Sequence, residues 1–178
     1  MSTTLIRVLV PGTSKRFRCG GLSVELQTAR LLSSLCATEL VTYRERHQDH
    51  PFLDNLLSVE PPRREVLWIV SWGFDVPALV RRLRNHRVAY HAHSSGYGFT
   101  LPPGVPVLAV SRNTLGYWGD RCPRNPLLLV PNAIEPGWLE WGARGSAERR
   151  PIDVWVQARK SSRYVLDQLV PALRQQGL

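Results

Sequence analysis

The chain has 178 residues, a formal net charge of +9 and a hydrophobic fraction of 43%, which are the values of an ordinary globular protein. No apolar run approaches the roughly 20 residues of a membrane-spanning helix, and the N-terminus lacks the basic segment of a secretory signal. Cys19, Cys36 and Cys122 are too few and too widely spaced for a disulfide framework or a CxxC zinc site. We therefore expect a cytoplasmic protein with reduced thiols.

The positive charge comes almost entirely from arginine, since Lys15 and Lys160 are the two lysines. Such a charge favours an anionic partner, namely nucleic acid, a phosphate-bearing ligand or an anionic membrane, or else marks a generally basic protein. The arginines are scattered and no stacking platform accompanies them, so nucleic acid is an unlikely partner. Peripheral membrane contact stays open beside a solvated helix face for one cluster of arginines and aromatic residues: Arg81, Arg82, Arg84, Arg87, Trp72 and Phe74.

Apolar periodicity predicts strands that alternate with helices along the chain. A helix after the first strand follows from an apolar stripe made of Leu22, Leu26, Ala29, Leu32 and Leu35. A later helix begins near Asp75, which suits the N-cap, and Pro77, which suits the first turn. The predicted strands are 5–10, 38–43, 65–72, 87–93, 105–111 and 127–134, and the predicted helices are 21–35, 75–86 and 112–121.

This alternation predicts an α/β fold with a Rossmann-like parallel sheet flanked by helices over residues 1–140. Residues 141–151 are rich in Gly, Arg and Glu and are expected to form a linker. A trailing βα unit follows over 152–178, with Ser161 or Ser162 as the helix cap and Pro171 as a kink or break. Because one βα unit cannot bury its own apolar faces, we expect either a truncated second domain or docking on the first domain or on a second copy, as in a homodimer.

The glycine pair Gly20-Gly21 lies between a basic loop and the first helix. Ligands of parallel α/β sheets bind at the carboxyl ends of the strands, where glycines allow close approach to the backbone and a helix N-terminus suits phosphate. Alternatively, the two glycines have only a structural role in a turn between the loop and the helix. It is not part of a GxGxxG motif, which argues against a dinucleotide fingerprint.

His91 and His93 are two residues apart at the end of a predicted strand and therefore face the same side. Three interpretations stay open: a metal pair without an evident third ligand, a polar or basic group at the mouth of a site, or one hydrogen-bonded structural histidine beside a solvent-exposed one. The loop that follows begins at Ser94. Asn132 ends another predicted strand, where it caps a turn or binds a ligand, and Arg159 and Lys160 precede the last helix, where they suit a diphosphate.

Taken in order, these features resemble the GT-B glycosyltransferases, in particular the large retaining family that includes bacterial sugar transferases and the sucrose and glycogen synthases. The resemblance spans most of the chain and is carried by the glycine pair, "AH" followed by Ser, "AVS", "VPNAIE" and "IDVWVQARKS", with Gly20, Gly21, His93, Ser94, Ser111, Asn132, Arg159 and Lys160. The chain departs from the family pattern at Ala133 and Glu135 and in the adjacency of Arg159 and Lys160.

The resemblance implies transfer of a sugar from a nucleotide-sugar to an acceptor with retention, without a cofactor or a catalytic metal. His93 would contact the transferring sugar as the catalytic candidate, while Gly20 and Gly21 would approach the donor. Arg159 and Lys160 would neutralise the leaving diphosphate. The family's paired-glutamate donor motif would lie beyond Leu178, so we expect the 178-residue chain to be inactive alone. Further cleft candidates are His91, Ser94, Ser111 and Asn132.

Two other functions stay open. One is a basic α/β module that binds nucleic acid. The other is a nucleotide-dependent α/β enzyme of another kind, against which the missing GxGxxG and Walker motifs count.

Overall fold

The computed structural model describes residues 4–132, 163 and 165–176. The chain divides into two units, Met1–Ala133 and Ile134–Leu178, which are treated separately. The expected linker 141–151 and strand 152–157 lie outside the described residues, as do Ser161, Ser162, Arg159 and Lys160.

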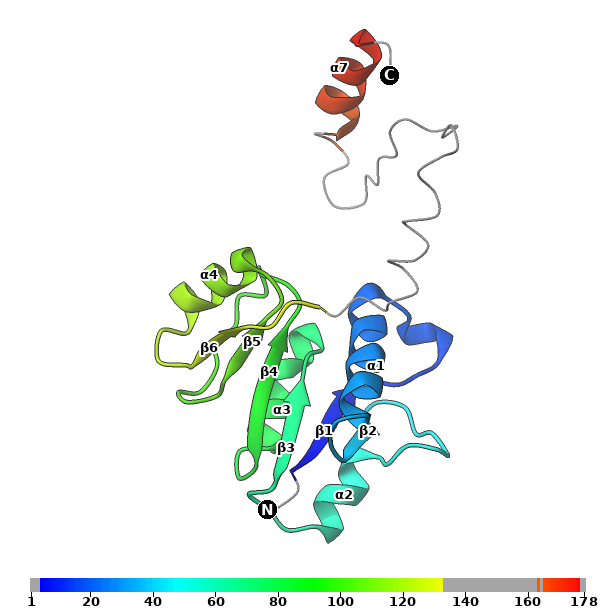
Figure 1. Cartoon of the computed structure of the whole chain (residues 1–178), viewed down its shortest axis with the longest axis vertical. Coiled ribbons are helices and arrows are strands. Elements are labelled where there is room, and N and C mark those ends of the chain that lie inside the picture. The colour runs from blue at the N-terminus through cyan, green and yellow to red at the C-terminus, as the bar shows by residue number, and fades with distance from the viewer. Residues whose placement is uncertain (1–3, 133–162, 164, 177–178) are drawn as a thin grey trace. The chain divides into compact units, whose positions relative to one another are not determined.

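The first unit contains a six-stranded, all-parallel sheet in the order β2-β1-β3-β4-β5-β6 (Figure 1). This confirms the predicted Rossmann-like α/β architecture. In this order the chain reverses its direction of travel across the sheet between β1 and β3, the point at which such folds bind ligands. The strands are β1 Leu5–Val10, β2 Thr38–Thr42, β3 Val66–Val70, β4 Arg87–Ala92, β5 Val107–Ala109 and β6 Leu127–Leu129.

Helices cover both faces of the sheet because side chains alternate along each strand. On one face, Val8 and Val10 of β1 pack with Leu22 of α1 (Gly20–Ser33). The other face forms the larger core, in which Leu9 packs with residues of three helices, α2 Leu53–Val59, α3 Val76–Arg82 and α4 Arg112–Arg121. Residues of β1 and β3 are therefore packed on both faces of the sheet, whereas the three residues of β6 are exposed.

Several details differ from the sequence prediction. Helix α3 ends at Arg82 and not at residue 86, β5 spans Val107–Ala109 and not 105–111, and β6 ends at Leu129 and not at residue 134. Helix α2 was not predicted, and α1 ends at Ser33, so Leu35 lies beyond the helix and is 82% exposed. The prediction that Asp75 caps α3 is wrong, because its backbone is helical and its side chain makes no cap hydrogen bond. The Asp75 carboxylate instead accepts hydrogen bonds from Tyr43 and Arg44. Pro77 does lie in the first turn of α3, as predicted.

In the second unit, a π-helical segment Val165–Leu169 continues into α7, Val170–Gln175. The change of helix type occurs next to Pro171, which lies at the first turn of α7. Proline removes a backbone donor and is tolerated at a first turn, so the predicted division of this helix near Pro171 agrees with the structure.

Candidate functional site

A carboxylate of helix α1 lies on the face of the helix that packs on the sheet. Glu25 shares the apolar stripe with Leu22 and Leu26, and its side chain is 2% exposed. Because an ionised carboxylate is costly to bury unless it is paired, Glu25 needs partners within the protein.

The partners come from β4, the strand between β3 and β5. Tyr90 and Ala92 of this strand point into the larger core, so His91 points to the opposite face, where α1 lies. His93 follows the last residue of β4 and continues this alternation. The strand thus presents both imidazoles to the helix that carries Glu25.

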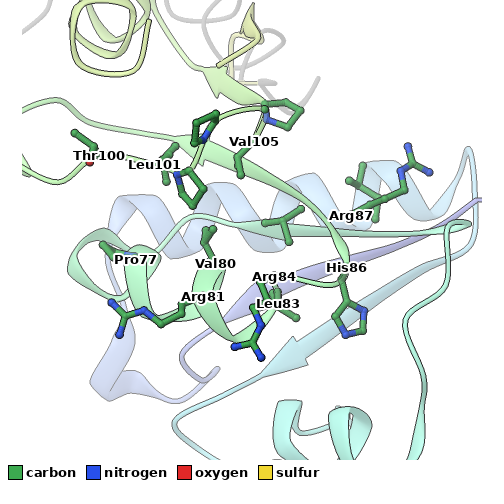
Figure 2. A pocket seen from close by; sticks show the side chains of 16 residues that line it. Pro77, Val80, Arg81, Leu83, Arg84, His86, Arg87, Thr100, Leu101 and Val105 are labelled. Carbon is green, nitrogen blue, oxygen red and sulfur yellow. The ribbon is translucent and has the colours of Figure 1, made fainter. Parts of the chain in front are cut away.

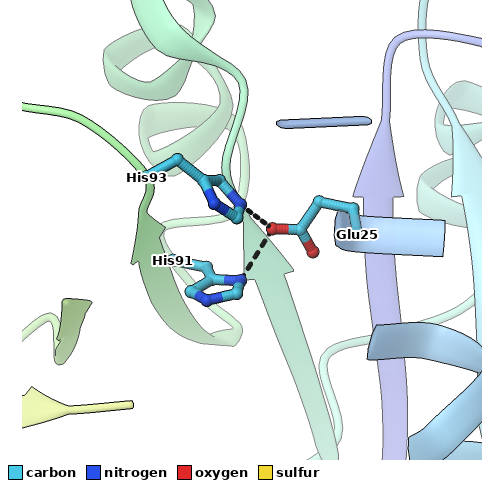
Figure 3. Close-up of side chains that lie close together, drawn as sticks. All are labelled: Glu25, His91 and His93. Carbon is cyan, nitrogen blue, oxygen red and sulfur yellow. Dashed lines mark hydrogen bonds and ion pairs between the residues drawn. The ribbon is translucent and has the colours of Figure 1, made fainter. Parts of the chain in front are cut away.

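Both histidines contact the same carboxylate oxygen (Figure 3). Nδ1 of His91 lies 2.7 Å and Nε2 of His93 lies 2.6 Å from Oε1 of Glu25. The two rings are 4.4 Å apart between centroids. Each of these nitrogens donates its proton to Oε1, which fixes the orientation of both rings.

The surroundings hold Glu25 in its ionised form. Burial raises the pKa of Glu25. The hydrogen bonds with His91 and His93 and the charges of these residues have the larger combined effect and lower the pKa to about 2. Oε2 of Glu25 and Nε2 of His91 are buried and have no hydrogen-bond partner among the described residues. The cluster therefore has unused acceptor and ligand capacity beside its satisfied contacts.

The arrangement suits two kinds of chemistry. A carboxylate that orients a histidine sets which ring nitrogen faces a substrate, as in many acid–base and polar binding sites. Alternatively, the three side chains offer one ligand atom each, all within 4.8 Å of one another, which is the span of a metal-ion site.

The glycine pair lies on the same helix as Glu25. Gly20 and Gly21 are the first two residues of α1, after Cys19, whose Sγ accepts from the N–H of Leu22 at 3.4 Å. Along a helix, four or five residues correspond to roughly 6–8 Å, so the pair begins about one turn before Glu25. A Cβ added at Gly20 would meet no described atom within 4 Å, and one at Gly21 would lie 3.8 Å from Sγ of Cys19.

The other predicted site residues have separate contacts. Oγ of Ser111 accepts from the N–H of Thr114 and caps α4. The carbonyl of Ser94 accepts a hydrogen bond from the indole of Trp118 at 3.1 Å. Asn132 is exposed, and Arg159 and Lys160 lie outside the described residues. The structure therefore brings together His91 and His93 among the predicted residues, and adds Glu25.

Glu25 was missed by the sequence analysis, although a signal for it exists. It is an acid three residues after Leu22 and one before Leu26, on the stripe that must face the sheet. A charged residue in that position indicates a buried partner. The identity of that partner depends on a contact across 66 and 68 sequence positions, which periodicity does not contain.

A second feature lies at the amino ends of the strands. A cavity of about 830 Å³ opens between α3 and residues 100–106, beside Leu67 of β3 and Val88 of β4 (Figure 2). Three arginines belong to its lining, namely Arg81, Arg84 and Arg87, and Arg87 donates to the carbonyl of Arg64. The neighbouring Arg82 forms an ion pair with Asp54. This cavity is at the opposite end of β4 from His93.

No helix within the described ranges combines the length and apolar character that a membrane crossing requires. Comparisons of the chain with protein-family models, with curated proteins and with solved structures give no match.

Proposed function

We propose that the chain is the acceptor-side half of a GT-B glycosyltransferase, which transfers a sugar from a nucleotide-sugar to an acceptor with retention. The observation that carries the proposal is the contact of Glu25 with His93. This contact joins α1, which begins at the glycine pair, to the carboxyl end of β4, which His93 follows. Two of the motifs that carry the resemblance therefore lie close together at the carboxyl ends of the strands.

The fold supports this assignment in two ways. The sheet is all parallel and its strand order changes direction between β1 and β3, so a ligand crevice is expected at the carboxyl ends of these strands. The 14-residue helix α1 begins at Gly20, after the loop that follows β1. Its first turn carries the positive end of the helix dipole, which favours a phosphate.

On this proposal His93 contacts the transferring sugar and Glu25 holds its ring in place. Gly20 and Gly21 leave room for the donor, since the described residues around them leave the added Cβ positions open or in ordinary contact. By the resemblance, Arg159 and Lys160, which lie outside the described residues, would neutralise the departing diphosphate and so stabilise the transition state.

The test is an assay of the protein expressed from its entire native reading frame. A panel of nucleotide-sugars is offered with an acceptor extract from the source cells, and release of nucleoside diphosphate is measured together with the mass of the glycosylated product. We expect one donor class to be turned over, and His93→Ala to lower kcat by about 100-fold or more, as for loss of a contact made in the transition state.

The matched control is His47→Ala, because His47 is a partly exposed histidine that contacts Asp49 and His50. This variant should keep the wild-type rate. Absence of turnover with every donor, or a wild-type rate for His93→Ala, would overturn the proposal.

A further inference from the structure

We propose that Glu25, His91 and His93 form a binding site for one divalent transition-metal ion of the zinc class. The inference does not rest on glycosyl transfer, since the ligands belong to the fold whatever the substrate is. It extends the sequence analysis, in which the two histidines had no evident third ligand and no metal was expected.

The first argument is the convergence of the ligand atoms. One ring nitrogen of His91, one of His93 and a carboxylate oxygen of Glu25 all lie within 4.8 Å of one another. Zinc binds imidazole nitrogen and carboxylate oxygen at about 2.0–2.2 Å, so tetrahedral ligand atoms are roughly 3.3 Å apart. The present separations of 2.6 and 2.7 Å from Oε1 are shorter than this spacing by less than about 1 Å.

The second argument is the unused capacity of buried atoms. Both hydrogen bonds go to Oε1, while Oε2 of Glu25 is buried without a partner among the described residues. A buried acceptor without a partner keeps the full cost of its removal from water. An ion bound by this carboxylate would give Oε2 a charged neighbour and would neutralise a carboxylate that is removed from water.

The third argument concerns the rigidity and type of the ligands. The two histidines come from the end of one central strand and the carboxylate comes from the helix packed on it, so the backbone holds all three. Two imidazoles and one carboxylate suit Zn²⁺, Co²⁺, Ni²⁺ or Fe²⁺, whereas Mg²⁺ and Ca²⁺ prefer sites made of oxygen alone. Three protein ligands leave at least one coordination position for water or another ligand.

Binding replaces the two N–H···O contacts. In a neutral ring, the proton on the coordinating nitrogen, Nδ1 of His91 or Nε2 of His93, moves to the other nitrogen of the same ring. In an imidazolium it is released to solvent, and the other nitrogen keeps its own proton. Each ring then offers a lone pair to the ion. No electron is transferred and no bond other than these N–H bonds is broken.

The chain contains a matched comparison group. His47, Asp49 and His50 lie in one loop, with the histidine rings 4.9 Å apart and Nδ1 of His47 3.6 Å from the carboxylate of Asp49. His47 and Asp49 are more than a third exposed. This group therefore serves as a control for the weak metal binding that is expected of histidines at the surface.

The experiment uses the full chain, freed of metal with a chelator and titrated with Co²⁺ and then Zn²⁺. Co²⁺ reports its coordination through visible d–d absorption, and Zn²⁺ affinity follows by competition. We expect one ion per chain, an intense four- or five-coordinate Co²⁺ spectrum, and displacement by Zn²⁺. In Glu25→Gln and His93→Asn the affinity should fall by about 10-fold or more, while the double variant His47→Ala/His50→Ala should bind as the wild type does.

A wild-type affinity equal to that of Glu25→Gln, or a loss that follows His47 and His50, would overturn the proposal. If the Glu25 variant does not fold, the imidazole NMR signals of the wild-type protein decide the matter. Addition of Zn²⁺ must shift His91 and His93 before His47 and His50, and the reverse order or no shift refutes the site. Metal binding and sugar transfer are read separately, so either proposal can fail while the other stands.

Discussion

Glu25 and His93 are 68 positions apart in the chain, and Oε1 of Glu25 lies 2.6 Å from Nε2 of His93. The same oxygen lies 2.7 Å from Nδ1 of His91. One buried carboxylate thus ties the first helix to the carboxyl end of a central strand. Its removal affects both the packing of α1 and the orientation of the histidines.

The stability of the fold is expected to depend on this carboxylate. Glu25→Ala leaves two buried imidazole N–H groups without an acceptor, and we expect it to lower the free energy of unfolding by about 3–5 kcal/mol. Glu25→Gln should lower it less, because the amide oxygen still accepts a hydrogen bond. Urea unfolding followed by circular dichroism measures both.

The control for this series is Glu65→Ala. Glu65 is exposed, and its backbone carbonyl accepts a hydrogen bond from the N–H of Leu5, a contact that the substitution leaves in place. Its free energy of unfolding should stay within about 0.5 kcal/mol of the wild type. Equal urea midpoints for Glu25→Ala and the wild type would mean that the cluster contributes nothing to stability.

The fold was largely predictable from the sequence because its strands are short apolar runs and its helices carry stripes of helical period. Residues 112–121 form a helix with the predicted bounds, and β1 matches 5–10. Helix α2 was not predicted, because it has seven residues and no residue that marks its start, whereas the equally short α3 is marked by Asp75 and Pro77. A sequence of that length contains too few turns for a periodic signal.

The candidate site was predictable only in part, because it depends on contacts between distant residues. The spacing of His91 and His93 on a strand shows that they face one side, but not that a helix residue meets them. Asp75 illustrates the same limit. Its position before Val76 favours a cap, yet a tertiary hydrogen bond from Tyr43 at 2.6 Å engages its carboxylate instead.

Tyr43→Phe tests that tertiary contact. The hydroxyl of Tyr43 donates to Oδ2 of Asp75 and joins the segment after β2 to the start of α3. Burial, and next the hydrogen bond to Asp75, raise the pKa of Tyr43, so the hydroxyl stays protonated at neutral pH. We expect a loss of about 1.5–3 kcal/mol in the free energy of unfolding, the usual range for a hydrogen bond to a charged group.

Tyr97→Phe is the comparison for Tyr43→Phe. The ring of Tyr97 contacts Phe74 and Phe99, and no side-chain hydrogen bond is described for its hydroxyl. Chemical denaturation of the two variants should therefore separate them. If both lose the same stability, the Tyr43–Asp75 hydrogen bond is not the cause.

The ion pairs of a buried arginine lead to a prediction of how the free energy of unfolding changes at acidic pH. Arg7 of β1 is 5% exposed and pairs with Glu39 at 2.8 Å and with Glu60 at 2.9 Å. The hydrogen bond from Arg7 lowers the pKa of Glu60 below its ordinary 4.5, against the opposing effect of burial. Because the folded-state pKa is depressed, this stabilisation is complete above about pH 4.5 and is lost as the pH falls through the lower folded value.

The measurement is urea unfolding of wild type and Glu60→Gln at several values between pH 7 and pH 3. The wild type should lose more stability than the variant below about pH 4.5, so the difference between them narrows as the pH falls. Above pH 5 the difference should be constant. Parallel curves over the entire range would show that Glu60 does not titrate with folding.

The proposed donor-side role of the glycine pair leads to a substitution that separates activity from folding. Gly21 has no positive φ, and its added Cβ would lie in ordinary contact with Sγ of Cys19 at 3.8 Å. We expect Gly21→Val to fold with a melting temperature within a few degrees of the wild type, since glycine is the poorer helix former. Under the proposed function it lowers kcat/KM of sugar transfer by about 100-fold or more, because the branched side chain occupies the donor's space.

Gly116→Val is the control, because Gly116 also lies in a helix, is exposed, and leaves an added Cβ without any described atom within 4 Å. It should keep both stability and activity, so a deficit confined to Gly21→Val reports on the ligand and not on helix formation. Gly21→Ala, whose side chain is the Cβ alone, decides the case if the valine variant misfolds: a folded and less active alanine variant agrees with the proposal. If Gly21→Val folds and transfers sugar at the wild-type rate, the glycine pair does not contribute to donor binding. This conclusion is independent of the result for His93→Ala.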